Sequence, residues 1–140
     1  MLDIITGIQQ VGIGVTDAQE AKLLYKQLFG MDVLIFDDRA DATLMTHYTG
    51  SQVHKRRAIL SLNMNGGGGF EIWQFTSRTP TKRIAIPKLG DLGIFAVKIK
   101  SSNVVNAHSH FSNLQNLQVS AIFDSPDDRK HFWLTDPYGN

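Results

Sequence analysis

The sequence predicts an α+β protein built from two βαβββ modules, and two observations carry this prediction. The first is the order of the expected elements: strand, helix and three strands, then a connector, then strand, helix and two strands. The second is an internal repeat, because residues 92–97 restart the strand pattern of residues 11–15. A repeat of this kind indicates two copies of one supersecondary unit that pack together.

The first module, residues 1–78, opens with an expected strand over residues 7–15. One face of this strand is apolar, and the other carries Gln10, Gly12 and Gly14. Two glycines inside a strand weaken it and favour the close approach of another group. The apolar face consists of Val11, Ile13 and Val15.

A helix is predicted next, between Asp17 and Gly30. Asp17 with Glu20 matches a capping box, and Gly30 is typical of a helix end. The helix has an apolar stripe at the spacing of a surface helix. The stripe consists of Ala21, Leu24, Tyr25 and Leu28.

Three further strands are predicted for this module, over residues 33–36, 57–63 and 70–75. A polar run closes the first of them, and a short helix is expected over residues 40–47. The glycine-rich run 65–69 indicates a hairpin connection, because a phosphate-binding loop would be followed by a helix.

A connector with Pro80 and Pro87 is predicted over residues 79–90, followed by the second module, residues 91–140. A strand is expected over residues 92–97, a helix after Ser101 and Ser102, and strands over residues 117–123 and 130–135. The helix stripe consists of Val104, Ala107, His108, Phe111 and Leu114.

The last five residues, 136–140, have the composition of a tight turn, Asp-Pro-Tyr-Gly-Asn. Such a turn normally joins two antiparallel strands, so we expect the last strand of the second module to be missing from this chain. This predicts that the natural protein is longer, or that the fold borrows the strand.

Composition excludes several classes of function. The formal net charge of +1 gives no electrostatic basis for binding nucleic acid or a membrane surface. The absence of cysteine excludes disulfides, zinc–thiolate sites and thiol nucleophiles. We expect a cytoplasmic protein with a small-molecule ligand, and exposed module edges are compatible with a homodimer.

Four features resemble the vicinal oxygen chelate superfamily, which includes glyoxalase I, extradiol dioxygenases, and fosfomycin- and bleomycin-resistance proteins. They are the paired modules, the Gln-Val-Gly-Ile-x-Val-x-Asp opening at residues 10–17, the Phe-Glu-Ile strand at 70–72 and the turn at 135–140. The resemblance covers nearly the whole chain. It implies a cup-shaped mixed sheet with helices outside and a divalent metal ion inside.

The resemblance also implies which residues hold the metal. Gln10 occupies the first-strand position, as in glyoxalase I, Glu71 the fourth-strand position, and Asp91 the first-strand position of the second module. The fourth ligand would fall about three residues past Asn140. An all-oxygen set suits a hard ion such as Mg²⁺ or Mn²⁺. We expect no organic cofactor.

Alternation along the strands places further residues on the face of Glu71. Trp73 shares that face, and His131 and Trp133 occupy the corresponding face of the second module. We expect Arg57 on the cup face too, opposite Leu60 and Leu62. Trp73, His131, Trp133 and Arg57 are therefore the candidate substrate-binding residues.

Two functions remain open at this point. The first is a glyoxalase-like isomerase or lyase, in which the metal polarises an oxygen of the substrate and Glu71 relays a proton. The second is a metal-free binding protein similar to bleomycin-resistance proteins, with a ligand between Trp73 and Trp133. Asp91 in place of histidine favours the second, and the ligand set disfavours an extradiol dioxygenase.

Overall fold

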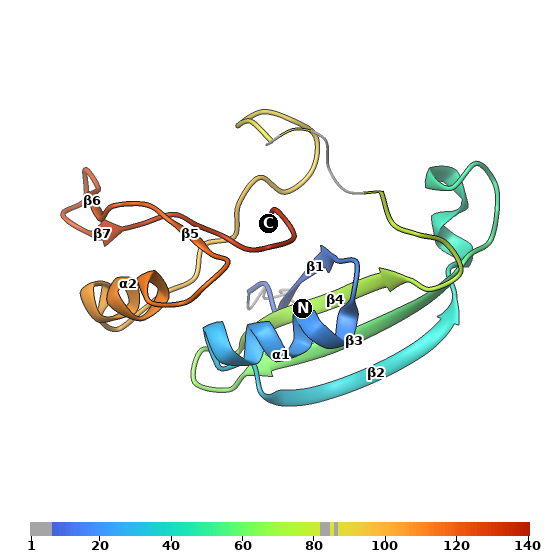
Figure 1. Ribbon diagram of the computed structural model, residues 1–140, viewed down its shortest axis with the longest axis horizontal. Coiled ribbons are helices and arrows are strands. Elements are labelled where there is room, and N and C mark those ends of the chain that lie inside the picture. Colours follow the sequence, from blue (N-terminus) through green and yellow to red (C-terminus); the bar gives the residue numbers. More distant parts are fainter. Residues whose placement is uncertain (1–6, 82–84, 86) are drawn as a thin grey trace, which may run out of the picture. The chain divides into compact units, whose positions relative to one another are not determined.

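The structure is a computed structural model, and it describes residues 7–81, 85 and 87–140. The predicted connector therefore lies partly outside the described residues. The chain divides into two compact units, Met1–Lys82 and Arg83–Asn140, which are called unit 1 and unit 2 (Figure 1). Within the described ranges, no helix has the length and apolar character needed to cross a membrane.

Unit 1 is a four-stranded mixed sheet with one long helix. Its strands are β1 (Gln10–Gly14), β2 (Val33–Asp41), β3 (Lys55–Asn63) and β4 (Gly68–Phe75), and its helix is α1 (Ala18–Phe29). The strand order in the sheet is β1-β4-β3-β2, with β1 parallel to β4 and the other pairs antiparallel. This is the predicted βαβββ order, and it confirms the α+β fold class with a mixed sheet.

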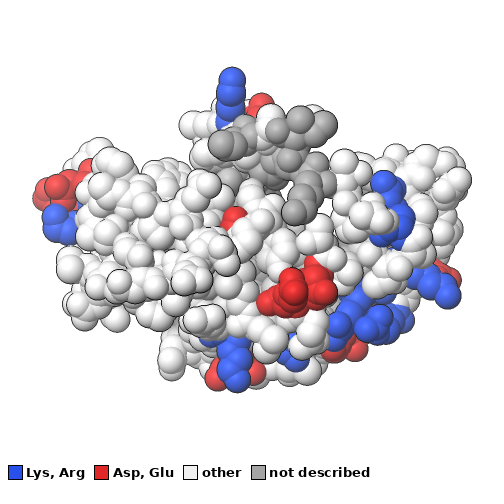
Figure 2. Space-filling view, viewed as in Figure 1, with Lys and Arg blue, Asp and Glu red and all other residues white. Residues whose placement is uncertain are grey.

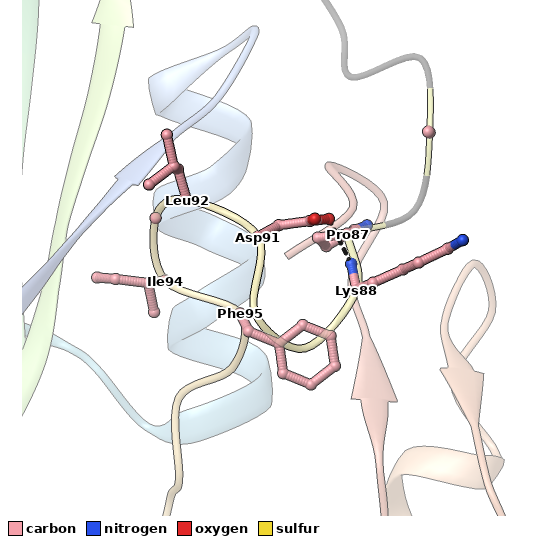
Figure 3. Close-up of a pocket in the computed structure, with 8 residues that line it drawn as sticks. Pro87, Lys88, Asp91, Leu92, Ile94 and Phe95 are labelled. Carbon is pink, nitrogen blue, oxygen red and sulfur yellow. Dashed lines mark hydrogen bonds between the residues drawn. The ribbon is translucent and has the colours of Figure 1, made fainter.

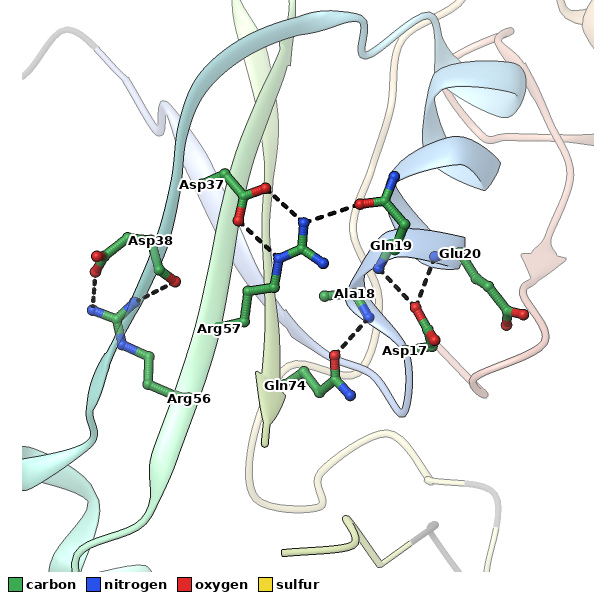
Figure 4. Close-up of polar contacts among 9 residues, drawn as sticks. All are labelled: Asp17, Ala18, Gln19, Glu20, Asp37, Asp38, Arg56, Arg57 and Gln74. Carbon is green, nitrogen blue, oxygen red and sulfur yellow. Dashed lines mark hydrogen bonds and ion pairs between the residues drawn. The ribbon is translucent and has the colours of Figure 1, made fainter. Parts of the chain in front are cut away.

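Local signals define both ends of α1. The Asp17 carboxylate accepts hydrogen bonds from the backbone N–H groups of Gln19 and Glu20 (Figure 4). Gly30 ends the helix with φ at 62°, a left-handed conformation that suits glycine. The helix buries Ala18, Ala21, Tyr25 and Leu28, and Leu24 is half-buried.

The two faces of the sheet are distinguished by α1. Tyr25 packs edge-on against Phe70, with ring centroids 5.0 Å apart, so the side chains that share the side of Phe70 form the α1 face. The opposite side, called the distal face here, carries Glu71 and Trp73 on β4. The strand register puts Gln10, Gly12 and Gly14 on the distal face as well. This confirms the prediction that the apolar residues of the first strand lie on the opposite face from Gln10, Gly12 and Gly14.

The prediction that Arg57 shares the cup face with Glu71 is wrong. Arg57 pairs with Gln74 in the β3–β4 register and donates a hydrogen bond of 2.9 Å to the Gln19 side chain of α1, so it lies on the α1 face. Leu60, opposite Glu71 in the register, lies on the distal face. Sequence alternation failed here because β3 is central: Ile59 and Leu60, on opposite faces, are both buried.

Two further elements of unit 1 differ from prediction. The second strand does not end at the polar run but continues to Asp41, because residues 36–41 pair with β3. The expected short helix is the 3₁₀ helix η1 (Thr43–Tyr48). The connection between β3 and β4 is the predicted hairpin, in which the Gly67 N–H donates to the Asn63 carbonyl oxygen at 2.8 Å.

Unit 2 contains helix α2 (Val104–Ser112) and four two-residue strands. These are β5 (Gln118–Val119), β6 (Phe123–Asp124), β7 (Lys130–His131) and β8 (Leu134–Thr135). Antiparallel pairing of β5 with β8 and of β6 with β7 gives one interrupted hairpin in place of the two longer predicted strands. The predicted strand over residues 92–97 does not form, because no strand in the described part of the chain pairs with it.

Helix α2 begins one residue later than predicted. Its cap is Asn103, whose side chain accepts a hydrogen bond from the Asn106 N–H at 2.9 Å. The predicted stripe is the half-buried side of the helix, and its residue Phe111 contacts Phe132 of the hairpin. The closing turn forms as predicted, because Asp136 Oδ1 accepts from the N–H groups of Tyr138 and Asn140, both at 2.9 Å.

Candidate functional site

A hydrogen bond joins the two predicted ligand residues of unit 1. The Gln10 side-chain amide donates to Glu71 Oε2 at 2.8 Å, across 61 positions of sequence. Parallel pairing of β1 with β4 creates this contact, since it puts both side chains on the distal face. Both residues are half-buried, so the bond fixes one orientation of the carboxylate. Neither Gln10 Oε1 nor Glu71 Oε1 has a hydrogen-bond partner among the described residues.

Beside this pair, β1 has two glycines, Gly12 and Gly14, and so presents bare backbone on the distal face. Gly12 is the register partner of Glu71, and Gly14 is the partner of Trp73. A Cβ atom added to either glycine would meet no heavy atom within 4 Å, so the space above both is open. A small molecule can therefore approach the strand closely next to the carboxylate.

An aromatic row continues along β4 from the carboxylate. The rings of Trp73 and Phe75 meet edge-to-face, with centroids 4.8 Å apart. Both side chains are half-buried, and they lie on the distal face with Glu71. The result is an amphipathic surface, with one oriented carboxylate at one end and π surfaces for a planar or apolar group beyond it.

Arg57 is engaged on the α1 face. Its guanidinium donates two hydrogen bonds to the Asp37 carboxylate, at 2.8 and 2.6 Å, and a third to Gln19 (Figure 4). The hydrogen bond from Arg57 lowers the pKa of Asp37, and the bond to Asp37 raises the pKa of Arg57. These contacts tie β2, β3 and α1 together. A role of Arg57 in substrate binding is untested and gains no support from this position.

Asp91 lies in a turn of unit 2. Its carboxylate accepts a hydrogen bond from the Lys88 N–H at 2.7 Å, and the Asp91 N–H donates to the Lys88 carbonyl oxygen (Figure 3). The predicted strand start is therefore a closed turn at this residue. Asp91 also lines a pocket of about 260 Å³ within residues 85–95, together with apolar side chains such as Leu92 and Phe95.

His131 and Trp133 lie on one side of the unit 2 hairpin, with ring centroids 6.5 Å apart. His131 Nδ1 is 2.8 Å from Ser125 Oγ, and Trp133 contacts Phe95 at 6.0 Å between centroids. Phe132 points to the other side, toward α2. The alternation predicted for these residues is confirmed, and their role in binding stays a prediction.

The residues of unit 1 fit part of a site for a hard divalent ion. Gln10 and Glu71 supply two oxygens, whereas Mg²⁺ takes six ligands, usually including several waters. Asp91, the third predicted ligand, uses its carboxylate in the turn. Across the described ranges, no three or more His, Cys, Asp or Glu side chains are grouped so that they could hold a metal ion.

Sequence reasoning missed two polar residues at the end of β4. Gln74 accepts a hydrogen bond from the Ala18 N–H (Figure 4). It also donates to the Thr16 carbonyl oxygen, and the two contacts fix the start of α1. Arg78 lies over the ring of Phe75, 5.4 Å from its centroid. The available signal was the polar run Thr-Ser-Arg-Thr at residues 76–79, directly after an aromatic strand end.

The charged side chains of the described residues are of both signs. On the face that Figure 2 presents, acidic and basic residues occur in small separate groups. Several are paired, including Arg56 with Asp38 at 2.9 Å and Lys130 with Asp124 at 2.6 Å. This mixture of signs agrees with the small formal net charge of the chain.

Comparison with solved structures identifies the fold as that of the glyoxalase and vicinal oxygen chelate proteins. The protein SMU.1112c matches with a TM-score of 0.68 and 14% identity, over 97% of this chain and 95% of that one. A glyoxalase family protein from Bacillus cereus matches with a TM-score of 0.63 and 12% identity, over 85% of this chain and 78% of that one. At these identities the likeness shows the fold. No family model and no curated protein sequence matches the chain.

Proposed function

We propose that the protein binds a small oxygenated ligand on the distal face of unit 1, with Glu71 as the principal polar contact. The observation that carries this proposal is the Gln10–Glu71 hydrogen bond beside the open backbone of Gly12 and Gly14. Glu71 lies beside the open space above Gly12, and Gln10 holds its carboxylate in one orientation. A ligand hydroxyl or N–H group can donate to Glu71 Oε1 while an apolar body lies against Trp73.

Two experiments test ligand binding at this site. In a Trp133→Phe background, Trp73 is the remaining tryptophan, so its fluorescence reports on the distal face. We expect titration with a panel of small hydroxycarbonyl and aromatic compounds to change this signal. Glu71→Gln should weaken binding of the responding compound about tenfold, as expected for a hydrogen bond to a charged group.

Glu20→Gln is the matched control, because Glu20 and Glu71 are the two glutamates of the chain and Glu20 is exposed on α1. Its affinity should equal that of the parent protein. Circular dichroism establishes that each variant is folded. Equal affinity of the Glu71→Gln and Glu20→Gln variants for the responding compound would overturn the proposal.

A second candidate function is a metal-assisted isomerase or lyase of the glyoxalase type. The observation that favours it is the presence of two oxygen donors, Gln10 and Glu71, side by side on the parallel strands β1 and β4. When bound, a divalent ion would polarise a substrate oxygen. Glu71 Oε1 would then accept the proton removed from the neighbouring carbon, with Gln10 steadying the carboxylate.

Calorimetric titration with Mn²⁺ and Mg²⁺ separates the two candidates without an assay of activity. Stoichiometric binding that Gln10→Ala and Glu71→Ala both abolish supports the metal-assisted function. Ligand binding at Trp73 that persists in the presence of a chelator supports the metal-free function. Absence of any saturable binding of either ion by the wild-type protein would reject the metal-assisted candidate.

A further inference from the structure

A pocket of about 470 Å³ lies at the carboxyl end of β4, outside the Gln10–Glu71 pair. It belongs wholly to unit 1. Its walls come from the loop between β1 and α1, the end of β4 and the segment that follows β4. The lining residues are Thr16, Gln74, Phe75, Thr76, Ser77, Arg78, Thr79 and Pro80.

The charge of this pocket favours an anion. The lining includes one cation, Arg78, and no carboxylate. No carboxylate among the described residues lies within ion-pair distance of the Arg78 guanidinium. The nearest acid in sequence to the wall residue Thr16 is Asp17, which is already occupied by the N–H groups at the start of α1. An incoming anion would therefore meet an uncompensated positive charge.

Aromatic contacts hold Arg78 in place. Its guanidinium carbon lies 5.4 Å from the centroid of the Phe75 ring, in cation–π geometry. Phe75 is itself fixed by Trp73 at 4.8 Å and by His54 at 5.8 Å between centroids. A planar guanidinium stacked on a ring loses less conformational entropy when it binds an oxyanion.

Hydrogen bonds also anchor the segment after β4. The Thr76 N–H donates to the Lys55 carbonyl oxygen at 2.8 Å, and Ser77 Oγ accepts from the Lys55 N–H at 2.9 Å. His54 Nδ1 lies 3.2 Å from Ser77 Oγ. The pocket wall is thus attached to β3 through both residues. The hydroxyls of Thr16, Thr76 and Thr79 make no hydrogen bond to the described residues, so they can donate to a ligand.

We propose that this pocket is an anion subsite, in which Arg78 and the threonine hydroxyls bind a carboxylate or phosphate group. The subsite extends the site of the proposed function along the row Glu71, Trp73 and Phe75. Phe75 lies four positions after Glu71 along the strand, a distance of about 13 Å at the usual rise per residue. The ligand class is therefore an elongated anionic molecule with a planar or apolar body. That description of the whole ligand rests on the proposed function, whereas anion binding at Arg78 does not.

Amide NMR titrations of the full chain test the subsite with four probes. Inorganic phosphate, phenyl phosphate and benzoate are anions, and benzyl alcohol is a neutral control. We expect the anions to shift the amide signals of Thr76, Ser77, Arg78 and Thr79. Comparison of phenyl phosphate with benzoate establishes whether phosphate or carboxylate is preferred. Arg78→Gln should weaken phenyl phosphate binding about tenfold or more, and Arg78→Lys should retain part of the affinity.

Arg39→Gln is the matched control, because Arg39 is an exposed arginine of β2 that does not line the pocket. It should bind phenyl phosphate as the wild type does. Glu71→Gln should leave binding of inorganic phosphate unchanged, so failure of the proposed function at Glu71 is distinguishable from failure of the subsite. Three outcomes would each overturn the subsite: no shift with any anion, equal losses in the Arg39→Gln and Arg78→Gln variants, or equal affinity for benzyl alcohol and phenyl phosphate.

Discussion

The sequence predicts the same order of elements at the start of units 1 and 2, but the two units differ in how much of their chain is buried. In unit 1, α1 packs on a four-stranded sheet and contributes four buried residues. In unit 2, α2 packs on a hairpin of two-residue strands and contributes none. Every buried apolar residue of the described chain belongs to unit 1. A similar sequence pattern has therefore led to two different degrees of core formation.

The difference between the two units shows that strand pairing completes a module of this fold, and that the local sequence pattern does not. In unit 1, β1 is a strand because β4 lies parallel to it and supplies hydrogen bonds over five residue pairs. In unit 2, residues 92–97 have the same kind of sequence but pair with no described strand. Leu92 and Ile94 are consequently exposed. The candidate site shares this dependence, since the Gln10–Glu71 contact exists through the β1–β4 pair.

The largest expected difference between the units concerns one aromatic residue on the inward side of each helix, Tyr25 of α1 and Phe111 of α2. Tyr25→Ala should lower the free energy of unfolding by about 4 kcal/mol, because Tyr25 is 1% exposed and packs on Phe70. Phe111→Ala in α2 should lower it by about 1 kcal/mol, because Phe111 is only half-buried. Urea unfolding followed by circular dichroism measures both. Equal losses would contradict the assignment of the core to unit 1.

A second comparison uses two glycines of the β1–β4 pair. Gly69→Ala should destabilise unit 1 by about 3 kcal/mol, because the new Cβ would collide with the Ser61 carbonyl oxygen and the Leu62 side chain. Gly12→Ala should change stability by less than about 1 kcal/mol, because no atom lies within 4 Å of its added Cβ. Trp73 fluorescence in a Trp133→Phe background follows the unfolding of unit 1. A larger effect at Gly12 would show that the surface beside Glu71 is filled.

The smallest expected effects concern one ion pair in each unit. Asp37→Asn should destabilise by about 1 kcal/mol at neutral pH, because it removes the bidentate contact with Arg57. Since the pKa of Asp37 is lowered in the folded protein, this stabilisation is complete above its ordinary value and is lost as pH falls through the folded pKa. The difference between the wild type and the variant should therefore vanish in acid.

Asp124→Asn in unit 2 is the counterpart of that change. The Asp124–Lys130 pair is largely exposed, with side-chain exposures of 78% and 54%, so solvent and salt screen it. We expect no measurable change in stability at any pH, although Lys130 lowers the pKa of Asp124 by its hydrogen bond. Thermal unfolding between pH 3 and pH 7 compares both variants. A pH-dependent loss for Asp124→Asn as large as that for Asp37→Asn would refute the contrast.

Part of the candidate site was predictable from sequence, and the reason differs for each residue. Gln10 and Glu71 each lie in a strand where neighbours alternate clearly, so their shared face was predicted and confirmed. Arg57 was assigned to the wrong face, because both faces of β3 are buried and alternation there does not indicate which side carries the helix. The pocket at Arg78 was not predicted from the sequence. Its walls combine the loop after β1 with the end of β4, and these two segments are about 60 residues apart in the chain.

Neighbouring residues are enough to specify the local features, which are the Asp17 cap, the Gly30 helix end, the hairpin before β4 and the Asp136 turn. Each of these depends on the conformational preference or hydrogen bonding of a few neighbouring residues. Three other features depend on tertiary contacts: β1 pairs with β4, Arg57 lies under α1, and residues 92–97 are not a strand. Those features depend on residues that are far apart in the sequence. A local sequence pattern does not specify the hydrogen bonds and packing between such residues.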